Sequence, residues 1–216
     1  MTHRHEAIAK PKLLLGEGKD ELEFFEALLR HLKIDDVQPM KYEGKSRLRP
    51  VLETIIQMPD FHTVTSIGIT RDADFPKSPA DQAVDSAFKS ICGTLRHANI
   101  ALPVPTALMQ KATRLDKPDI TIFIMPDCEN DGMLEDLCLE SLADEIEMGC
   151  VDNYVKCLEK IRGNPIAEHK LPKARLNTWI ASQDAPDLSL GIATQRRYIN
   201  FRHPAFDQLK KFVLSL

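Results

Sequence analysis

The sequence predicts an α/β fold in which a mainly parallel, Rossmann-like sheet carries helices on both faces and ends in a helical C-terminal extension. Two observations lead to this expectation. Short apolar runs alternate with stretches whose apolar residues recur at helical spacing, a pattern typical of parallel sheets covered on both faces. In addition, three of the apolar runs end in acidic residues, and ligands of open α/β sheets bind beyond the carboxyl ends of the strands.

The first third of the chain predicts two units, each a strand followed by a helix. A strand at Lys12 to Leu15 leads through a glycine-containing turn into a helix whose apolar residues, from Leu22 to Leu32, recur at helical spacing. Acidic residues in the first turn suit the positive end of the helix dipole. A second strand at Val37 to Tyr42 precedes a helix at Leu48 to Met58, which Pro59 ends.

The middle of the chain adds two more strands. Val64 to Thr70 is rich in β-branched residues and Ile120 to Met125 is mostly apolar, so both are expected to be buried. A loop at Phe75 to Pro79 and a helix from about Val84 to Leu95 separate them, and Leu102 to Pro105 is expected to be a short extended segment. Four further helices are expected, from Asp131-Gly132 onward, at Val151 to Ile161, at Lys173 to Ser182 and at Ala205 to Leu216.

Length and charge indicate one structural domain with two differently charged parts. The 216 residues suffice for one large core, and we expect residues 1–150 to form the α/β core and residues 151–216 a helical extension packed on it. Residues 127–159 carry eleven Asp and Glu against one Lys, whereas residues 160–216 carry ten Lys and Arg against four Asp and Glu. A basic extension suits a polyanion such as nucleic acid, although solvated helix faces explain the same charges.

The cysteines and the lack of long apolar runs predict a cytosolic protein. The five cysteines are odd in number and contain no Cys-x-x-Cys pair, which argues against a disulfide framework and against a thiolate zinc site. No apolar run approaches the roughly 20 residues that a membrane helix needs, and the polar start lacks the apolar stretch of a signal peptide. We therefore expect the protein in the cytoplasm, without a membrane partner.

Carboxylates at the predicted strand ends indicate a metal site. Asp72 and Asp74 lie two residues apart after the third strand, so an extended backbone would project both side chains from one face. Glu17 follows the first strand, and Asp127 follows the strand that ends at Met125. Hard divalent cations take oxygen ligands, and Mg²⁺ is typically held by one or two carboxylates together with substrate phosphates.

Glycines and lysines beside these carboxylates are candidates for phosphate binding. Gly16 and Gly18 permit close approach of backbone N–H groups to a phosphate at the start of the first helix, and Lys19 would add a positive charge. Gly44 and Lys45 follow the second strand in a basic segment. A solvated surface loop remains the alternative interpretation of both segments.

The segment from Pro126 to Leu137 holds the densest group of acids in the chain. We expect Asp131 to cap the helix that follows, and Glu135 to point from its first turn toward the strand ends. The segment partly imitates a calcium-binding loop. However, Cys138 stands where an EF-hand needs a bidentate Glu, which excludes that motif.

Several common enzyme motifs are excluded. Gly44-Lys45-Ser46 resembles the end of a P-loop, but Pro39 stands where the first glycine of that loop is required. The sequence contains no His-Glu-x-x-His and no Gly-x-Ser-x-Gly, so a zinc protease or a serine hydrolase lacks support. A phosphatase of the haloacid-dehalogenase type is a weaker alternative, because Asp72 to Pro76 lacks the Thr or Val that follows the Asp pair of those enzymes.

In combination, Gly16 to Glu21 after the first strand, Gly44 after the second and Asp72-Ala73-Asp74 after the third resemble the Toprim domain of topoisomerases, primases and OLD-type nucleases. The resemblance implies that the strand-one Glu and the Asp-x-Asp pair bind Mg²⁺ for phosphoryl transfer. Phe123 to Asp127 with Gly132 to Asp136 is similar to small bacterial Toprim-related proteins, and this likeness runs through most of the chain.

Likeness to the OLD-type nucleases implies a second acidic cluster and a late lysine. Glu135 or Asp136 is the nearest counterpart of the cluster, and Lys173, which follows Pro172 in a basic segment, is the nearest counterpart of the lysine. The chain lacks the ATPase domain of full-length OLD proteins and the tyrosine-bearing domains of topoisomerases. The resemblance therefore implies a nuclease module that acts without ATP.

Together these patterns favour a nuclease dependent on Mg²⁺ or Mn²⁺ that cleaves DNA or RNA. Bound metal would activate water and stabilise the leaving oxygen, and Lys173 would neutralise charge on the phosphate. The alternative is a non-catalytic Toprim-like module that binds nucleic acid or a partner protein in a defence or repair complex. The carboxylates expected to bind metal are Glu17, Asp72, Asp74, Asp127, Glu135 and Asp136.

Overall fold

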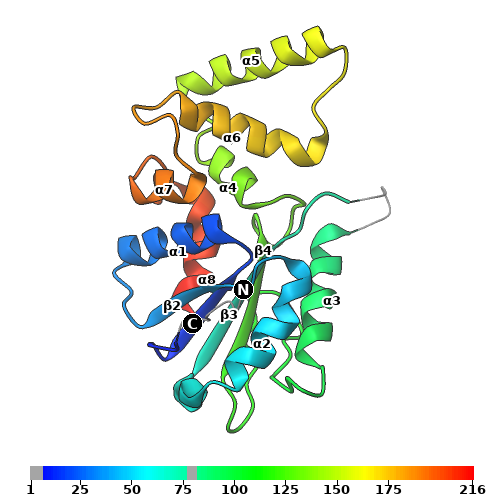
Figure 1. Cartoon of the computed structure of the whole chain (residues 1–216), viewed down its shortest axis with the longest axis vertical. Helices are drawn as coiled ribbons and strands as arrows, with labels where there is room; N and C mark the ends of the chain where they lie inside the picture. The colour runs from blue at the N-terminus through cyan, green and yellow to red at the C-terminus, as the bar shows by residue number, and fades with distance from the viewer. Residues whose placement is uncertain (1–6, 77–81) are drawn as a thin grey trace, which may run out of the picture.

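The computed structural model describes residues 7–76 and 82–216, and in these residues the strands form one four-stranded, entirely parallel sheet (Figure 1). The strands are β1 (Lys12–Gly16), β2 (Val37–Lys41), β3 (Ser66–Asp72) and β4 (Asp119–Met125), in the spatial order β2-β1-β3-β4. Nearly every residue of β1, β3 and β4 is buried, because helices cover both faces of the sheet. The predicted Rossmann-like α/β fold is confirmed.

The helices between the strands place a switch point between β1 and β3. Helix α1 (Lys19–Leu32) crosses from β1 to β2 on one face, whereas α2 (Leu48–Ile56) and α3 (Ala83–Leu95) cover the other face. The chain leaves β1 in one direction across the sheet and later adds β3 on its opposite side. Ligands of open α/β sheets bind at such a point, outside the carboxyl ends of the strands.

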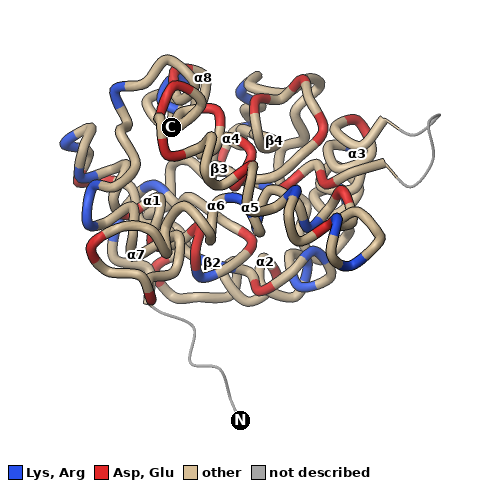
Figure 2. Tube along the Cα trace, turned by 90° about the horizontal axis from the view of Figure 1, so that it is seen from above, with Lys and Arg blue, Asp and Glu red and all other residues tan. Residues whose placement is uncertain are grey.

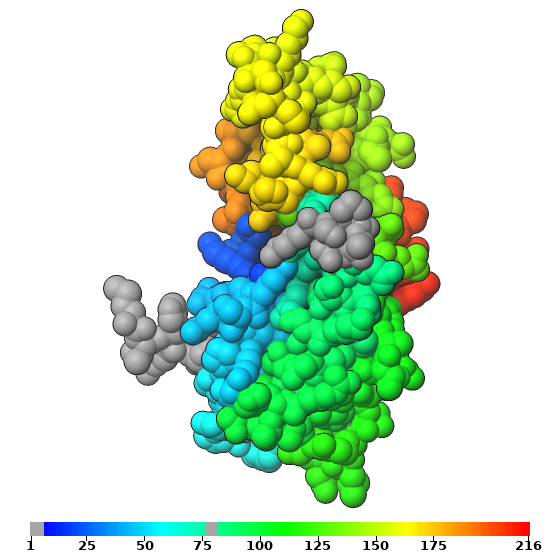
Figure 3. Space-filling view, turned by 90° about the vertical axis from the view of Figure 1, so that its right-hand side faces the viewer, coloured from blue at the N-terminus to red at the C-terminus, as the bar shows by residue number. Residues whose placement is uncertain are grey.

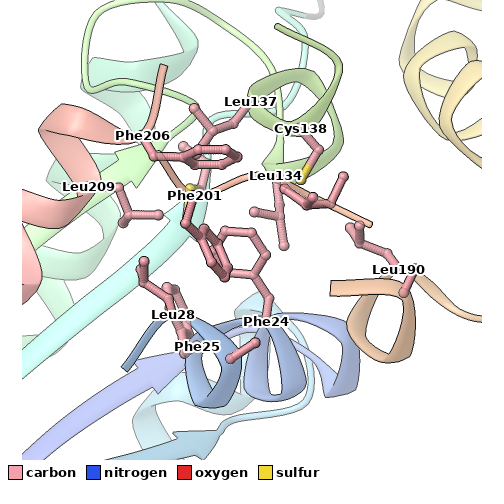
Figure 4. Close-up of a cluster of buried hydrophobic side chains, with 14 of the residues drawn as sticks. Phe24, Phe25, Leu28, Leu134, Leu137, Cys138, Leu190, Phe201, Phe206 and Leu209 are labelled. Atoms are coloured by element: carbon pink, nitrogen blue, oxygen red, sulfur yellow. The ribbon is translucent and has the colours of Figure 1, made fainter. Parts of the chain in front are cut away.

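Aromatic side chains pack between α1 and the C-terminal part of the chain. Phe24 of α1 meets Phe201 edge to face with ring centroids 5.2 Å apart, and Phe201 meets Phe206 in the same way at 5.3 Å (Figure 4). Edge-to-face pairs of this kind stabilise a core beyond the area that they bury. Residues from the first and last parts of the chain therefore share one hydrophobic cluster.

Helix α8 (Asp207–Leu214) lies directly against the middle of the sheet. A Cβ atom added to Gly68 of β3 would lie 2.9 Å from the ring of Phe212 and 2.8 Å from Leu216. The close approach of α8 thus requires a position without a side chain. On the opposite face, α2 and α3 pack aliphatic side chains such as Ile55 and Ile91, both fully buried, against the sheet.

Helices α4 to α7 lie beyond the carboxyl ends of the strands and are here called the helical roof (Figures 1 and 3). Leu176 and Trp179 of this roof belong to the same buried cluster as Phe24 and Phe123 of the α/β part. Residues 151–216 therefore pack on the core. The roof helices are α4 (Leu134–Glu140), α5 (Ile146–Arg162), α6 (Leu171–Ala181) and α7 (Leu190–Gln195). Short 3₁₀ segments occur at Lys45–Arg47, Pro59–Thr63, Glu168–Lys170 and Pro204–Phe206.

Residues 102–105, expected to be a short extended segment, lie outside the helices and strands of the described residues. Other local predictions are corrected by the structure. Met133 is the N-cap residue of α4, and its backbone N–H donates to Asp136 Oδ2 at 2.9 Å. The carboxylate that caps this helix is therefore that of Asp136, not that of Asp131 as predicted. Helix α5 begins at Ile146 rather than Val151, and α7 was not predicted.

The predicted loop from Phe75 to Pro79 lies partly outside the described residues. None of the helices among the described residues is long and apolar enough to cross a membrane.

Candidate functional site

The turn from β1 into α1 brings Glu17 and Glu21 to the carboxyl edge of the sheet. This turn depends on Gly16, because an added Cβ there would lie 3.1 Å from Glu21 Cβ and 3.2 Å from the ring of Phe25. The backbone N–H of Gly18 donates to Glu21 Oε2, so Glu21 caps the start of its own helix. Glu21 is buried, and the buried Glu17 Oε2 has no hydrogen-bond partner among the described residues.

Asp72 reaches the same region from the end of β3. Its Oδ1 accepts a hydrogen bond of 3.0 Å from the backbone N–H of Leu134, the first residue of α4. This bond satisfies a donor that the start of a helix otherwise leaves unpaired. It also fixes the first turn of α4, which carries Glu135, over the ends of the strands.

Glu135 and Lys173 close the region from the side of the helical roof. Lys173 lies in the first turn of α6 after Pro172, and its Nζ is 3.5 Å from Glu135 Oε1. The Glu135 side chain is only 13% exposed, whereas that of Lys173 is 59% exposed. The lysine therefore reaches from solvent toward the carboxylates.

Glu17, Glu21, Asp72 and Glu135, here called the acidic cluster, act on one another electrostatically. Burial is the largest cause of the raised pKa of Asp72, and the charges of Glu21, Glu135 and Glu17 add to it. Burial also raises the pKa of Glu21 to about 7, aided by the charges of Glu17 and Glu135 and opposed by the hydrogen bond from the Gly18 N–H.

Lys173 offsets part of this negative charge. Burial raises the pKa of Glu135, and the nearby ammonium group of Lys173 opposes that rise. In return, the charge of Glu135 is the main cause of the raised pKa of Lys173, and Asp72 contributes to it. The lysine thus stays charged beside the acidic cluster.

The acidic cluster offers the oxygen ligands that Mg²⁺ and Mn²⁺ prefer. Within residues 7–76 and 82–216, no three Asp, Glu, His or Cys side chains are gathered closely enough to form a ready-made metal site. A cation would therefore have to draw the carboxylates together. Two observations fit a cation here. The buried Glu17 Oε2 has no hydrogen-bond partner among the described residues. The raised pKa values of Asp72 and Glu21 arise first from burial and then from neighbouring carboxylates, and a cation would offset the negative charge of those neighbours.

Asp74 does not share the position of Asp72. Strand β3 ends at Asp72, and the backbone of Asp74 has a φ of 62°, so the extended conformation assumed for the pair is absent. The Asp74 N–H instead donates to the Gly132 carbonyl at 2.8 Å. Its carboxylate forms an ion pair with Lys45. The predicted pair on one face is therefore corrected to two carboxylates with different partners.

Asp127 and Asp136 act as local caps. Burial acts to raise the pKa of Asp127, but hydrogen bonds from Asn130 and Glu129 lower it overall. The backbone N–H of Asn130 lies 2.7 Å from Asp127 Oδ1, and that of Glu129 lies 3.0 Å from the same oxygen. Asp136 accepts the N-cap bond of α4 described above. Asp127, Glu135 and Asp136 formed a second group of predicted metal ligands. Of these three, the structure brings Glu135 into the acidic cluster.

The loop after β2 lies beside Glu17, as expected for a loop at the switch point. The Gly44 N–H donates to the carbonyl of Glu17 at 3.1 Å, which ties the two loops together. Lys45, the next residue, is ion-paired with Asp74. This loop therefore links the ends of β1, β2 and β3.

The remaining candidate phosphate-binding groups are engaged within the chain. Gly18 gives its N–H to Glu21, and Lys19 Nζ lies 3.4 Å from Glu23 Oε1. The role that the structure gives to Gly16 is close packing. A phosphate at this helix start would have to compete with these internal contacts.

Sequence reasoning missed two residues of this region. Glu21 was interpreted only as a helix-starting acid, although its position one helical turn after Glu17 was a signal. Arg71 is 2% exposed within β3, where its Nη1 donates to Ser90 Oγ at 2.9 Å. Its Nε and Nη2 are buried without a partner among the described residues. A charged residue directly before Asp72 in an apolar strand was the available signal.

A basic hollow lies at the other end of α1. It has a volume of about 510 Å³, and Arg30, His31, Arg197 and Arg202 are among the residues that line it. Along α1, Glu21 of the acidic cluster and Arg30 of this hollow are nine residues apart, which corresponds to about 14 Å. Seen from above, the positions of Lys and Arg are interspersed with those of Asp and Glu along the described part of the chain (Figure 2).

Comparison with known proteins identifies a family for this chain. A family model described as "Protein of unknown function (DUF3226)" matches residues 11–216, which include the whole sheet and the helical roof. No curated protein matches the chain, and no solved structure matches it.

Proposed function

We propose that this chain, which belongs to the DUF3226 family, is a Toprim-like nuclease that cleaves nucleic-acid phosphodiesters with Mg²⁺ or Mn²⁺. One observation carries the proposal. The four carboxylates of the acidic cluster lie near enough to act on one another electrostatically at the switch point of a parallel sheet, and Lys173 Nζ is 3.5 Å from Glu135 Oε1. Carboxylates with perturbed pKa values in such a position are candidates for function.

Each residue has a distinct part in the proposed reaction. Glu17, Asp72 and Glu135 would hold the cation, and Glu21 adds negative charge beside them. When bound, the cation activates water and stabilises the leaving oxygen. Lys173 would donate to a phosphate oxygen as negative charge develops there, and its ion pair with Glu135 supports this role by holding the ammonium group beside the acidic cluster.

A nuclease assay with a matched control tests the proposal. Labelled single-stranded and double-stranded DNA and RNA are incubated with the purified protein in Mg²⁺, in Mn²⁺ and in a chelator. We expect cleavage that requires metal and is lost in Asp72→Asn. The control is Asp116→Asn, an exposed aspartate whose backbone φ of 59° suits Asn. Absence of cleavage by the parent protein, or equal cleavage by both variants, contradicts the proposal.

The basic hollow favours a second candidate function, a non-catalytic Toprim-like module that binds nucleic acid. Three arginines and a histidine line a hollow wide enough for phosphate groups. The test is binding of labelled DNA and RNA by fluorescence anisotropy, with Arg30→Ala/Arg202→Ala as the variant. Tight, salt-dependent binding that this variant weakens, without any cleavage, selects the binding module. A partner protein would then supply any chemistry.

We also propose that the protein works in the cytoplasm. All five cysteines are free, as expected in a reducing compartment. Fractionation of cells that produce the untagged protein tests this location.

A further inference from the structure

Helix α5 is the outermost element of the helical roof, on the far side of α6 from the sheet (Figures 1 and 3). One face of α5 is attached firmly, because Met148, Val151 and Val155 are buried against the rest of the roof. The ion pair between Asp152 and Arg175, with an O–N distance of 2.8 Å, adds a polar link to α6. The opposite face of α5 therefore points steadily away from the molecule.

That outward face carries a continuous row of apolar and thiol side chains, here called the outer stripe. Ile146 is 90% exposed, Ile161 is 76% exposed and Tyr154 is 52% exposed, which is unusual for such large apolar groups. Successive members are three or four residues apart, the spacing that aligns side chains along one side of a helix. The outer stripe consists of Ile146, Cys150, Tyr154, Cys157 and Ile161.

The outer stripe is complementary to itself when two copies run antiparallel. If the centre of the pairing lies between Asn153 and Tyr154, Ile146 of one copy is level with Ile161 of the other. Cys150 is then level with Cys157 of the other copy, and the two Tyr154 rings flank the centre. A two-fold axis at that point repeats each contact twice, as in isologous interfaces.

The charges along α5 also suit the antiparallel arrangement. Glu145 and Glu147 mark the N-terminal end, with Asp144 just before it, whereas Lys160 and Arg162 mark the C-terminal end. Antiparallel pairing brings the acidic end of each copy to the basic end of the other. Parallel pairing would set like charges side by side, which costs stability and disfavours that orientation.

We propose that the protein forms a symmetric homodimer through antiparallel pairing of α5, with the outer stripe as the apolar centre of the interface. The pairing covers the exposed isoleucines and places opposite charges at both ends. It is independent of the acidic cluster, which lies on the other side of α6 and α4.

The first test is the oligomeric state in solution. Sedimentation equilibrium over a concentration series is expected to show a monomer–dimer equilibrium for the parent protein. Ile146→Asp/Ile161→Asp should weaken dimerisation at least about tenfold, with an unchanged circular dichroism spectrum. Leu115→Asp is the matched control, because Leu115 is 88% exposed but lies far from α5 in the chain. A parent protein that stays monomeric throughout overturns the proposal.

The two exposed cysteines test the orientation. An added oxidant that accepts two electrons and two protons should join Cys150 of one copy to Cys157 of the other. Identical residues would be offset by about 10 Å along the helix axes, too far for a disulfide. Cys150→Ser alone and Cys157→Ser alone should therefore not cross-link, whereas a mixture of the two should. Cross-linking of Cys157→Ser with itself overturns the antiparallel arrangement.

Reversing the charges at the ends of α5 tests the antiparallel pairing, because one change should weaken the dimer and a second should restore it. Lys160→Glu/Arg162→Glu makes both ends of α5 acidic and should weaken the dimer about tenfold. Adding Glu145→Lys/Glu147→Lys reverses the other end and should restore dimerisation toward the parent level. Failure of this rescue, with both proteins folded, overturns the proposed pairing.

Discussion

The acidic cluster and the outer stripe lie on opposite sides of the helical roof, and each reverses the usual distribution of side chains. Carboxylates are normally solvated, yet Glu21 is buried and Glu135 nearly so. Isoleucines are normally buried, yet Ile146 and Ile161 are almost fully exposed. This contrast shows that α4 and α6 cover buried carboxylates, whereas α5 presents an apolar surface to solvent. We assign a cation and a phosphate to the first region, and a second copy of the chain to the other.

The largest effect is expected within the acidic cluster, where Asp72 and Asp74 should differ. Asp72→Asn should lower metal-dependent cleavage on the order of 100-fold or more, because it removes a ligand charge at the reacting centre. Asp74→Asn should cost clearly less, since the Asp74 carboxylate is ion-paired with Lys45. Initial rates at saturating metal measure both. Equal losses would remove the distinction drawn between the two aspartates.

Lys173→Ala should give the next largest effect. We expect cleavage to fall roughly 10-fold to 100-fold, while binding of nucleic acid changes little, because the ammonium charge acts chiefly in the transition state. Lys170→Ala is the matched control, an exposed lysine just before α6. Single-turnover rates and fluorescence anisotropy separate the two effects. Parallel losses in rate and in binding would reassign Lys173 to substrate binding.

Glu21→Gln should change how stability depends on pH. The pKa of Glu21 is about 7 in the folded chain against a reference value of 4.5, so the folded chain binds this proton more tightly than the unfolded chain. The stability from Glu21 is complete below the reference pKa and is lost as the pH rises through about 7. Gln stays neutral and keeps an oxygen for the Gly18 N–H.

Without metal, the Glu21→Gln variant should therefore be more stable than the parent at about pH 8 by roughly 1–3 kcal/mol, and similar to it near pH 4. Urea unfolding at several pH values measures this difference. Added Mg²⁺ or Mn²⁺ should narrow the gap at the higher pH, because it stabilises the parent by linkage. A constant difference across the pH range would show that Glu21 does not titrate as proposed.

Two glycines give the smallest expected effects, of opposite sign in the two regions. Gly16→Ala should destabilise the protein by roughly 1–3 kcal/mol, because the new Cβ would press on Glu21 and Phe25. Gly149→Ala should stabilise it by roughly 0.5–1 kcal/mol, because Ala favours the helix and the new Cβ would meet nothing within 4 Å. Thermal unfolding measures both. A loss of stability in Gly149→Ala would indicate that α5 is not freely exposed on that side.

The sheet could be predicted from sequence because its signals are local. Strands β1, β3 and β4 each contain an apolar run, and Glu17 and Asp72 stand where such runs end. The sequence failed where distant segments decide the structure. Helix α7 has only six residues, and its place depends on Gly191, where an added Cβ would lie 2.5 Å from Glu23 Cβ of α1. Six residues are too few to show a periodic pattern from which this contact could be predicted.

The acidic cluster was predicted only in part, because local signals identify some of its residues and distant segments decide the rest. Glu17, Asp72 and Glu135 were identified by their positions in predicted elements, whereas Lys173 was identified by the likeness to OLD-type nucleases. The importance of Glu21 arises from burial beneath the roof and from charges that come from other elements, and neither is visible in the local sequence. Asp74 was assumed to continue an extended strand, whereas its bridge to Gly132 turns the backbone.

The contact between Gly68 and α8 has a consequence for how the protein is made on the ribosome. Strand β3 is synthesised early, but Phe212 and Leu216, which cover its middle, are synthesised more than a hundred residues later. Until they emerge, one face of the central strand stays apolar and uncovered, a state prone to aggregation. Folding of this face is therefore postponed to the end of translation, and chaperones that shield nascent chains should bind this protein longest between the synthesis of β4 and that of α8.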